Sequence, residues 1–134
     1  MIRSPQTPRE WEHYYQLRYD ILRAPWGQPI GSEQTADEKV HQHFSYFDNF
    51  NQILGVGRLD SVDSQTTQIR FMAVAEQQQG KGIGRALMEE MENVSKEMGI
   101  PLGTVKTRMR SAIIELRKMF NDAGVSIYAY KPDS

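Results

Sequence analysis

The sequence predicts an α+β fold in which a mostly antiparallel sheet is flanked by helices. Three observations lead to this fold class. Within residues 40–76, apolar and polar residues alternate with the period of a strand, in three segments separated by short polar turns. Before and after this region, apolar residues recur at helical spacing. The 134 residues and their 39% hydrophobic content suit about one domain, so we expect a single domain over residues 1–134.

The N-terminal region predicts a short strand in "MIRSP" followed by a helix. Thr7 is placed to cap this helix, Pro8 suits its first position, and Glu10 would complete a capping box. One face of the helix would be apolar, with Arg18 as the one polar interruption of the stripe Trp11, Tyr14, Tyr15, Ile21 and Leu22. The segment "APWGQPIGS" ends the pattern and predicts a long loop.

The central region predicts an antiparallel meander of three strands, in the segments "HQHFSYF", "ILGVGRLDSV" and "TQIRFMAVAE". A second helix would follow in "QQQGKGIGRALMEEMENVSKEMG". Its apolar face is formed by Leu87, Met88, Met91, Val94 and Met98.

Composition excludes several classes of protein. The 16 basic and 17 acidic residues give no overall field that would attract nucleic acid, and the lack of cysteine excludes disulfides and thiolate sites. His41 and His43 are two residues apart but have no third ligand at suitable spacing, so we expect no metal site. No apolar run approaches the 18 residues of a membrane span, and we expect a cytoplasmic protein that does not contact membranes.

The most informative motif is "QQQGKGIGRAL", between the third strand of the meander and the second helix. Gly80, Gly82 and Gly84 allow a tight turn, and the amides of the following helix N-terminus can bind phosphate. A dinucleotide fingerprint would need a glycine where Arg85 stands, and a Walker loop would need Ser or Thr after Lys81. A glycine-rich connection that binds nothing is the alternative.

In this strand-turn-helix setting, Gln77-Gln78-Gln79-Gly80-Lys81-Gly82 resembles the acetyl-CoA motif of the GNAT N-acyltransferase superfamily, Gln/Arg-x-x-Gly-x-Gly/Ala. The resemblance covers roughly residues 1–99. It implies that the backbone of Met72, Ala73 and Val74 pairs with the pantetheine arm as an added strand. It also implies that the pyrophosphate is held by the backbone of Gln79, Gly80, Lys81, Gly82, Ile83, Gly84 and Arg85, with charge added by the two cations of that segment.

The resemblance also implies direct transfer of an acetyl group from the thioester to an amine, which needs a proton acceptor and a proton donor. In the family, a tyrosine after the fifth strand commonly donates the proton. Phe120 stands near that place here and cannot donate a proton. Tyr128 and Tyr130 are close by in sequence, and Tyr128 is taken as the candidate donor, although a buried sheet position is the favoured interpretation of each. Glu76 and Asp60 are candidate bases, and for both an ordinary exposed carboxylate is the competing interpretation.

The C-terminal part, from about residue 99, is atypical of the family and has two interpretations. "GIPLGTVKTRMRSAIIELR" resembles the helix-turn-helix of region four in bacterial sigma factors, with a basic helix over residues 104–118. In the acyltransferase interpretation, residues 102–109 form a fifth strand, residues 111–124 a helix and residues 125–131 a sixth strand. The usual seventh strand would then be missing, leaving a sheet edge for a second chain to cover, so we expect a homodimer.

Taken together, these features predict a GNAT-like acyltransferase that uses acetyl-CoA as co-substrate to acetylate an amine of a small molecule or peptide. Two alternatives stay open. One is a DNA-binding regulator that uses residues 104–118, although we expect no nucleic-acid partner. The other is a CoA-binding protein without catalytic activity.

Overall fold

The computed structural model describes residues 1–100, 102–106 and 129–131. Two α-helices lie in this part of the chain, α1 (Pro8–Leu22) and α2 (Ile83–Met98). Short 3-10 helices are η1 (Ala24–Trp26), η2 (Glu38–Val40) and η3 (Glu76–Gln78). The strands are β1 (Ile2–Arg3), β2 (Gln42–Phe47), β3 (Ile53–Asp63), β4 (Thr66–Val74), β5 (Leu102–Lys106) and β6 (Ala129–Lys131).

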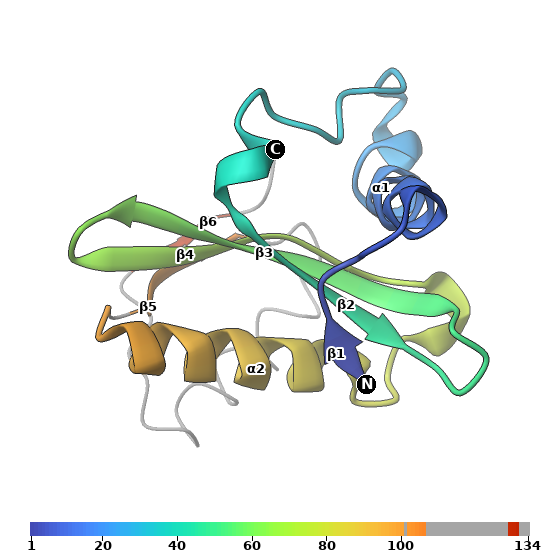
Figure 1. The fold of residues 1–134 in the computed structure, drawn as a ribbon. Helices are drawn as coiled ribbons and strands as arrows, with labels where there is room; N and C mark the ends of the chain where they lie inside the picture. Colours follow the sequence, from blue (N-terminus) through green and yellow to red (C-terminus); the bar gives the residue numbers. More distant parts are fainter. Residues whose placement is uncertain (101, 107–128, 132–134) are drawn as a thin grey trace.

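The strands form one sheet in the order β1-β2-β3-β4-β5-β6. Pairing is antiparallel from β1 to β4 and parallel between β4 and β5 and between β5 and β6. Helix α1 covers one face of this sheet and α2 covers the other (Figure 1). The predicted α+β class with a mixed, mostly antiparallel sheet is therefore confirmed.

The predicted elements of the C-terminal part are confirmed where the structure describes them. Residues 102–106 of the expected fifth strand and residues 129–131 of the expected sixth strand are extended and paired. The helical interpretation of the sigma-like segment is wrong for residues 104–106, which lie in β5. The rest of that segment, from residue 107 onwards, lies outside the described residues.

Helix α1 begins where its capping residues predict. The Thr7 hydroxyl accepts a hydrogen bond from the Glu10 amide at 3.1 Å, and Pro8 occupies the first turn. Glu10 differs from a capping box, because its carboxylate accepts from the Gln6 amide and pairs through both oxygens with Arg3. The salt bridge to Arg3 and the Gln6 amide lower the pKa of Glu10 to about 2. Glu10 thus ties the start of α1 to β1.

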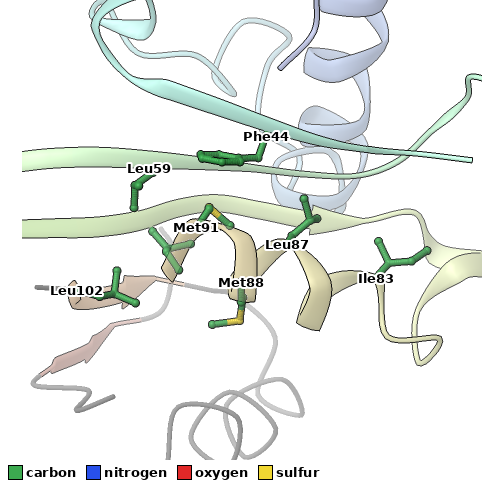
Figure 2. Close-up of a cluster of buried hydrophobic side chains, with 8 residues drawn as sticks. Phe44, Leu59, Ile83, Leu87, Met88, Met91 and Leu102 are labelled. Carbon is green, nitrogen blue, oxygen red and sulfur yellow. The ribbon is translucent and has the colours of Figure 1, made fainter. Parts of the chain in front are cut away.

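The face of the sheet under α2 is the larger apolar core. Figure 2 shows Leu87 and Met91 pointing from α2 toward the strands. The buried residues of this core are Phe44, Leu59, Ile69, Ile83, Leu87, Met88, Met91 and Leu102. Two glycines of β3 let α2 approach closely. A Cβ at Gly55 would lie 2.8 Å from Ile83 Cγ2 and 2.9 Å from Leu87 Cδ1, and a Cβ at Gly57 would lie 2.7 Å from Met91 Cε.

Strand β4 carries a β-bulge at Phe71. In the register with β3, Arg58 faces Arg70 and Val56 faces Ala73, so Phe71 and Met72 together oppose Gly57. Phe71 has φ +54°, which is rare for a residue with a bulky side chain. The bulge reverses the side-chain alternation: Ile69 packs under α2, whereas Phe71 and Ala73 pack under α1.

The close approach of α2 to β3 gives a prediction about stability. We expect Gly55→Ala to lower the free energy of unfolding by about 1–3 kcal/mol, because the new methyl group would overlap the branched Ile83 side chain. Gly57→Ala should lower it less, because the clashing atom is the end of the flexible Met91 side chain. Urea denaturation measures both. Equal loss in the two variants would contradict this packing argument.

Candidate functional site

A glycine turn between β4 and α2 forms one half of the site. Gly80 and Gly82 have φ +81° and +86°, and Gly82 is the N-cap of α2. A glycine cap provides no side chain to accept from the first helical amides, and the cap position makes no side-chain hydrogen bond. The amides of Ile83, Gly84 and Arg85 are therefore available to an anion at the positive end of the helix dipole.

The surroundings of the turn favour an anion as well. The first turn of α2 has no acidic residue. Lys81 and Arg85 are exposed beside it, and the Lys81 ammonium donates to the Gln78 side-chain oxygen at 3.3 Å. Gln79 anchors the turn to the sheet, because its side-chain amide donates to the Val74 carbonyl at 3.1 Å.

The outer edge of β4 forms the other half of the site. β5 pairs with β4 only at Thr67, Gln68 and Ile69, and no other strand among the described residues pairs with residues 70–74 on that side. The bulge at Phe71 lies two residues beyond Ile69, the last residue of β4 that pairs with the described part of β5. Backbone groups of Met72, Ala73 and Val74 can therefore accept an added strand.

These two halves adjoin, because β4 leads through η3 directly into the glycine turn. All ten residues predicted to bind the cofactor thus lie in one continuous strip: three at the end of β4, four in the turn and three in the first turn of α2. Ile83 is buried in the core beneath the helix, so only its backbone faces a ligand.

Comparison with known proteins identifies the family. Residues 9–113 match the sequence model of the acetyltransferase (GNAT) family. The chain belongs to the GNAT acetyltransferase family. As an acetyltransferase it shares a fold with many solved structures. An acetyltransferase of the GNAT family from Staphylococcus aureus Mu50 is 18% identical, with TM-score 0.66, over 92% of this chain and 84% of that one.

Two further neighbours have the same fold. A GNAT family acetyltransferase from Elizabethkingia anophelis, solved with acetyl-CoA bound, is 22% identical, with TM-score 0.61, over 90% of this chain and 72% of that one. Glucosamine-6-phosphate N-acetyltransferase from Arabidopsis thaliana is 13% identical, with TM-score 0.67, over 100% of this chain and 96% of that one.

The predicted catalytic residues of the acetyltransferase have different surroundings. Glu76 is the first residue of η3 and is exposed, two residues beyond the end of β4. Tyr128 lies outside the described residues. The competing base, Asp60, is not free: it is buried, and both of its oxygens accept from the Arg58 guanidinium, at 2.7 and 2.8 Å. Asp60 is therefore a buried ion-pair partner, so its interpretation as an ordinary exposed carboxylate is wrong, and its role as a base stays a prediction.

A buried ionic network under α1 was missed by the sequence analysis. Arg18 and Arg58, both 0% exposed, share the Glu38 carboxylate at 2.8 and 3.0 Å. Burial alone would raise the pKa of Glu38, but the charge of Arg18 and the Thr35 amide outweigh it and lower this pKa. Arg18 was visible in the sequence as a polar interruption of an apolar stripe. Its partner Glu38, 20 residues away in η2, was not.

His43 lies at the edge of this network. Its Nε2 is 2.7 Å from the Glu38 carbonyl and so donates to it. In the neutral ring that its lowered pKa favours, Nδ1 accepts from the Tyr14 hydroxyl at 2.8 Å, a hydroxyl that also lies 3.1 Å from the Gly57 carbonyl. Burial is the main reason that the pKa of His43 is lowered, and the charges of Arg18 and Arg58 add to the effect against the Glu38 carbonyl.

The described part of the chain contains neither a metal-binding cluster nor a membrane-spanning helix. Across residues 1–100, 102–106 and 129–131, no group of three or more His, Cys, Asp or Glu side chains could hold a metal ion. His41 instead contacts Asp37 at 2.8 Å. Neither α1 nor α2, nor any other helix within the same ranges, combines the length and apolar character needed to cross a bilayer.

The neutral His43 gives a pH prediction. Its pKa is lower in the folded protein than the usual value near 6.5, so on acidification below pH 6.5 the unfolded chain binds a proton that the folded protein does not. Stability should therefore fall as the pH drops below 6.5, by up to about 1.4 kcal/mol per pH unit. We expect His43→Gln to flatten this slope and the exposed-site variant His13→Gln to preserve it, as measured by thermal unfolding. An unchanged slope in His43→Gln would refute the assignment.

Proposed function

We propose that this acetyltransferase binds acetyl-CoA along β4 and the glycine turn and transfers the acetyl group to an amine of a small molecule or peptide. The observation that carries the proposal is the outer edge of residues 70–74, which no described strand pairs, next to helix amides that face no capping side chain. A pantetheine arm carries amide groups that can pair with such an edge, and a pyrophosphate suits the helix N-terminus. The Gln79 bond uses one lone pair of the Val74 carbonyl and leaves the second for a ligand.

This arrangement sets the direction of the bound cofactor. With the pyrophosphate at the start of α2, the pantetheine arm runs from Val74 towards Met72, and the thioester reaches the bulge at Phe71. The amine attacks the thioester carbonyl there, the carbon–sulfur bond breaks, and the thiolate takes a proton. We propose Tyr128 as donor to the thiolate and Glu76 as acceptor of the amine proton. Glu76 lies five residues beyond the bulge, on the pyrophosphate side, so the proton would reach it through a chain of bound waters.

The amine substrate, the homodimer, the cytoplasmic location and the absence of a nucleic-acid partner stay predictions. Binding of acetyl-CoA is tested before any of them, because acetyl transfer depends on it.

The first experiment tests acetyl-CoA binding. At about 100 times its Kd, acetyl-CoA should stabilise the protein by about 3 kcal/mol. Gly82→Val should abolish this gain, because a β-branched residue at φ +86° would distort the turn and its side chain would block the pyrophosphate. Gly99→Val is the matched control: Gly99, at the other end of α2, has φ +71° and also open space around it. Thermal shift with acetyl-CoA measures both. Equal stabilisation of the two variants by acetyl-CoA would contradict the proposed site.

A second experiment tests Glu76. Glu76→Gln should lower kcat by about 100-fold and remove the acidic limb of the pH–rate profile, with the Kd for acetyl-CoA unchanged, because the amide cannot accept a proton. Glu97→Gln, at an exposed position near the other end of α2, is the control and should leave kcat and the profile unaltered. A normal profile in Glu76→Gln would show that another group takes the proton.

A further inference from the structure

Four guanidinium groups surround the ring of Phe71 at the bulge. The Cζ atoms of Arg18, Arg58, Arg70 and Arg23 lie 4.6, 4.8, 4.7 and 5.6 Å from the ring centroid. They come from four places in the chain: the middle of α1, β3, β4 and the C-cap of α1. We call these four side chains the arginine cluster.

Two carboxylates form ion pairs with this cluster, and they pair with some of its arginines and not with others. Glu38 pairs with Arg18 and Arg58, and Asp60 pairs through both oxygens with Arg58. Asp60 is also 3.7 Å from Arg70 Nη1, too far for a hydrogen bond. The Glu33 carboxylate is turned to the Gly31 amide instead, at 2.7 Å. Four cations against two carboxylates leave a local positive excess.

Arg23 is the member of the cluster whose positive charge is least compensated. Its side chain is buried, with the residue 8% exposed, and its Nε has no hydrogen-bond partner. No carboxylate among the described residues forms a salt bridge with it. The face of an aromatic ring compensates a desolvated guanidinium only in part. Arg70 Nε is also buried and unpartnered, although the Arg70 side chain as a whole is 26% exposed.

The cluster lies beside the expected position of the reaction. Phe71 is the bulged residue, and Met72 begins the edge that would bind the pantetheine arm. The guanidinium groups face the α1 side of the sheet at this point, whereas α2 and the pyrophosphate turn lie on the other side. Arg70, the most exposed member, provides the side of the cluster that solvent reaches.

From this cation excess we propose that the acetyl acceptor is an amine that carries a carboxylate or phosphate group, and that Arg23 and Arg70 bind this anionic group. A planar guanidinium takes either anion through paired hydrogen bonds. The inference rests on the proposed acetyl transfer, in which the amine nitrogen bonds to the acetyl carbon, the carbon–sulfur bond breaks and the thiolate takes the released proton. Arg23 and Arg70 would fix the acceptor and take no part in that chemistry.

Anion binding is tested first with inorganic phosphate as the probe, with CoA present so that the glycine turn is occupied. Phosphate should raise the Tm of the wild type by about 5 °C as it saturates, because it binds the folded state alone. Arg23→Met should lose this rise, and Arg9→Met, which removes an exposed cation elsewhere on α1, should keep it. The same rise in all three proteins would overturn the inference.

A second measurement excludes a trivial loss of folding. If Arg23 has no anionic partner in the free protein, replacing it by the apolar methionine should leave Tm at low ionic strength unchanged or higher. Arg58→Met should lower Tm clearly, because it leaves Glu38 and Asp60 short of a partner. A fall in Arg23→Met as large as that in Arg58→Met would mean that Arg23 is already compensated, and the inference would fail.

Matched acceptors then separate this inference from the proposed function. Glucosamine 6-phosphate should be acetylated with a kcat/KM at least 10-fold above that of glucosamine, and phenylalanine at least 10-fold above phenylalaninamide, in whichever pair is accepted. Arg23→Met should remove the preference. Equal use of both members of a pair would overturn the anionic acceptor and leave acetyl transfer standing. A lack of stabilisation by acetyl-CoA would instead contradict the proposed function. The phosphate titration would still show whether Arg23 binds an anion.

Discussion

The bulge at Phe71 is the constraint on which the rest of the site depends. A bulky residue at positive φ costs about 1–3 kcal/mol, so it persists only where its surroundings hold it. Here the ring is 1% exposed and enclosed by the arginine cluster. The enclosed ring thereby fixes the position of the extra residue in β4. The pairing of β4 with the described part of β5 ends just before it, at Ile69.

The ionic network extends this constraint into the loop that follows α1. Arg18 lies on α1, Glu38 on η2 and Arg58 on β3, so one carboxylate joins the helix, the loop and the sheet. Thr35 adds to this network, because its amide donates to Glu38 and its hydroxyl accepts from Arg58. Removing one member would leave an uncompensated buried charge, which is far more destabilising than removing a surface pair. The loop after α1 and the bulge in β4 are therefore held in fixed positions relative to each other.

The sequence predicted the elements whose signal is local. Strand alternation, the Thr7 cap and the glycines between β4 and α2 all appear in the structure where they were expected, and the last of these led to the cofactor strip. The bulge left no such signal. Thr67, Ile69, Phe71 and Ala73 are all buried, so the alternation in β4 looks unbroken, although Phe71 and Ala73 face the opposite side of the sheet from Ile69.

The two candidate bases also show what the sequence alone could not predict. Asp60 and Glu76 look alike in sequence, as carboxylates within or after a strand. Only the fold reveals that Asp60 meets Arg58, two residues away on the same strand and on the same face of the sheet, whereas Glu76 stays exposed beyond the end of β4. Charge pairing of this kind depends on burial, which the alternation of residue types does not report.

The proposed cofactor strip and the arginine cluster differ in the sequence signal they leave. The strip would act through backbone groups, so it needs glycines and an open strand edge, and these needs leave a short contiguous motif. The arginine cluster is made of side chains from α1, its C-cap, β3 and β4. No motif can record it, because its members meet only after the sheet and α1 have packed together. The acceptor of an enzyme built in this way has to be inferred from the charges gathered on the α1 face, while its cofactor can be inferred from six consecutive residues.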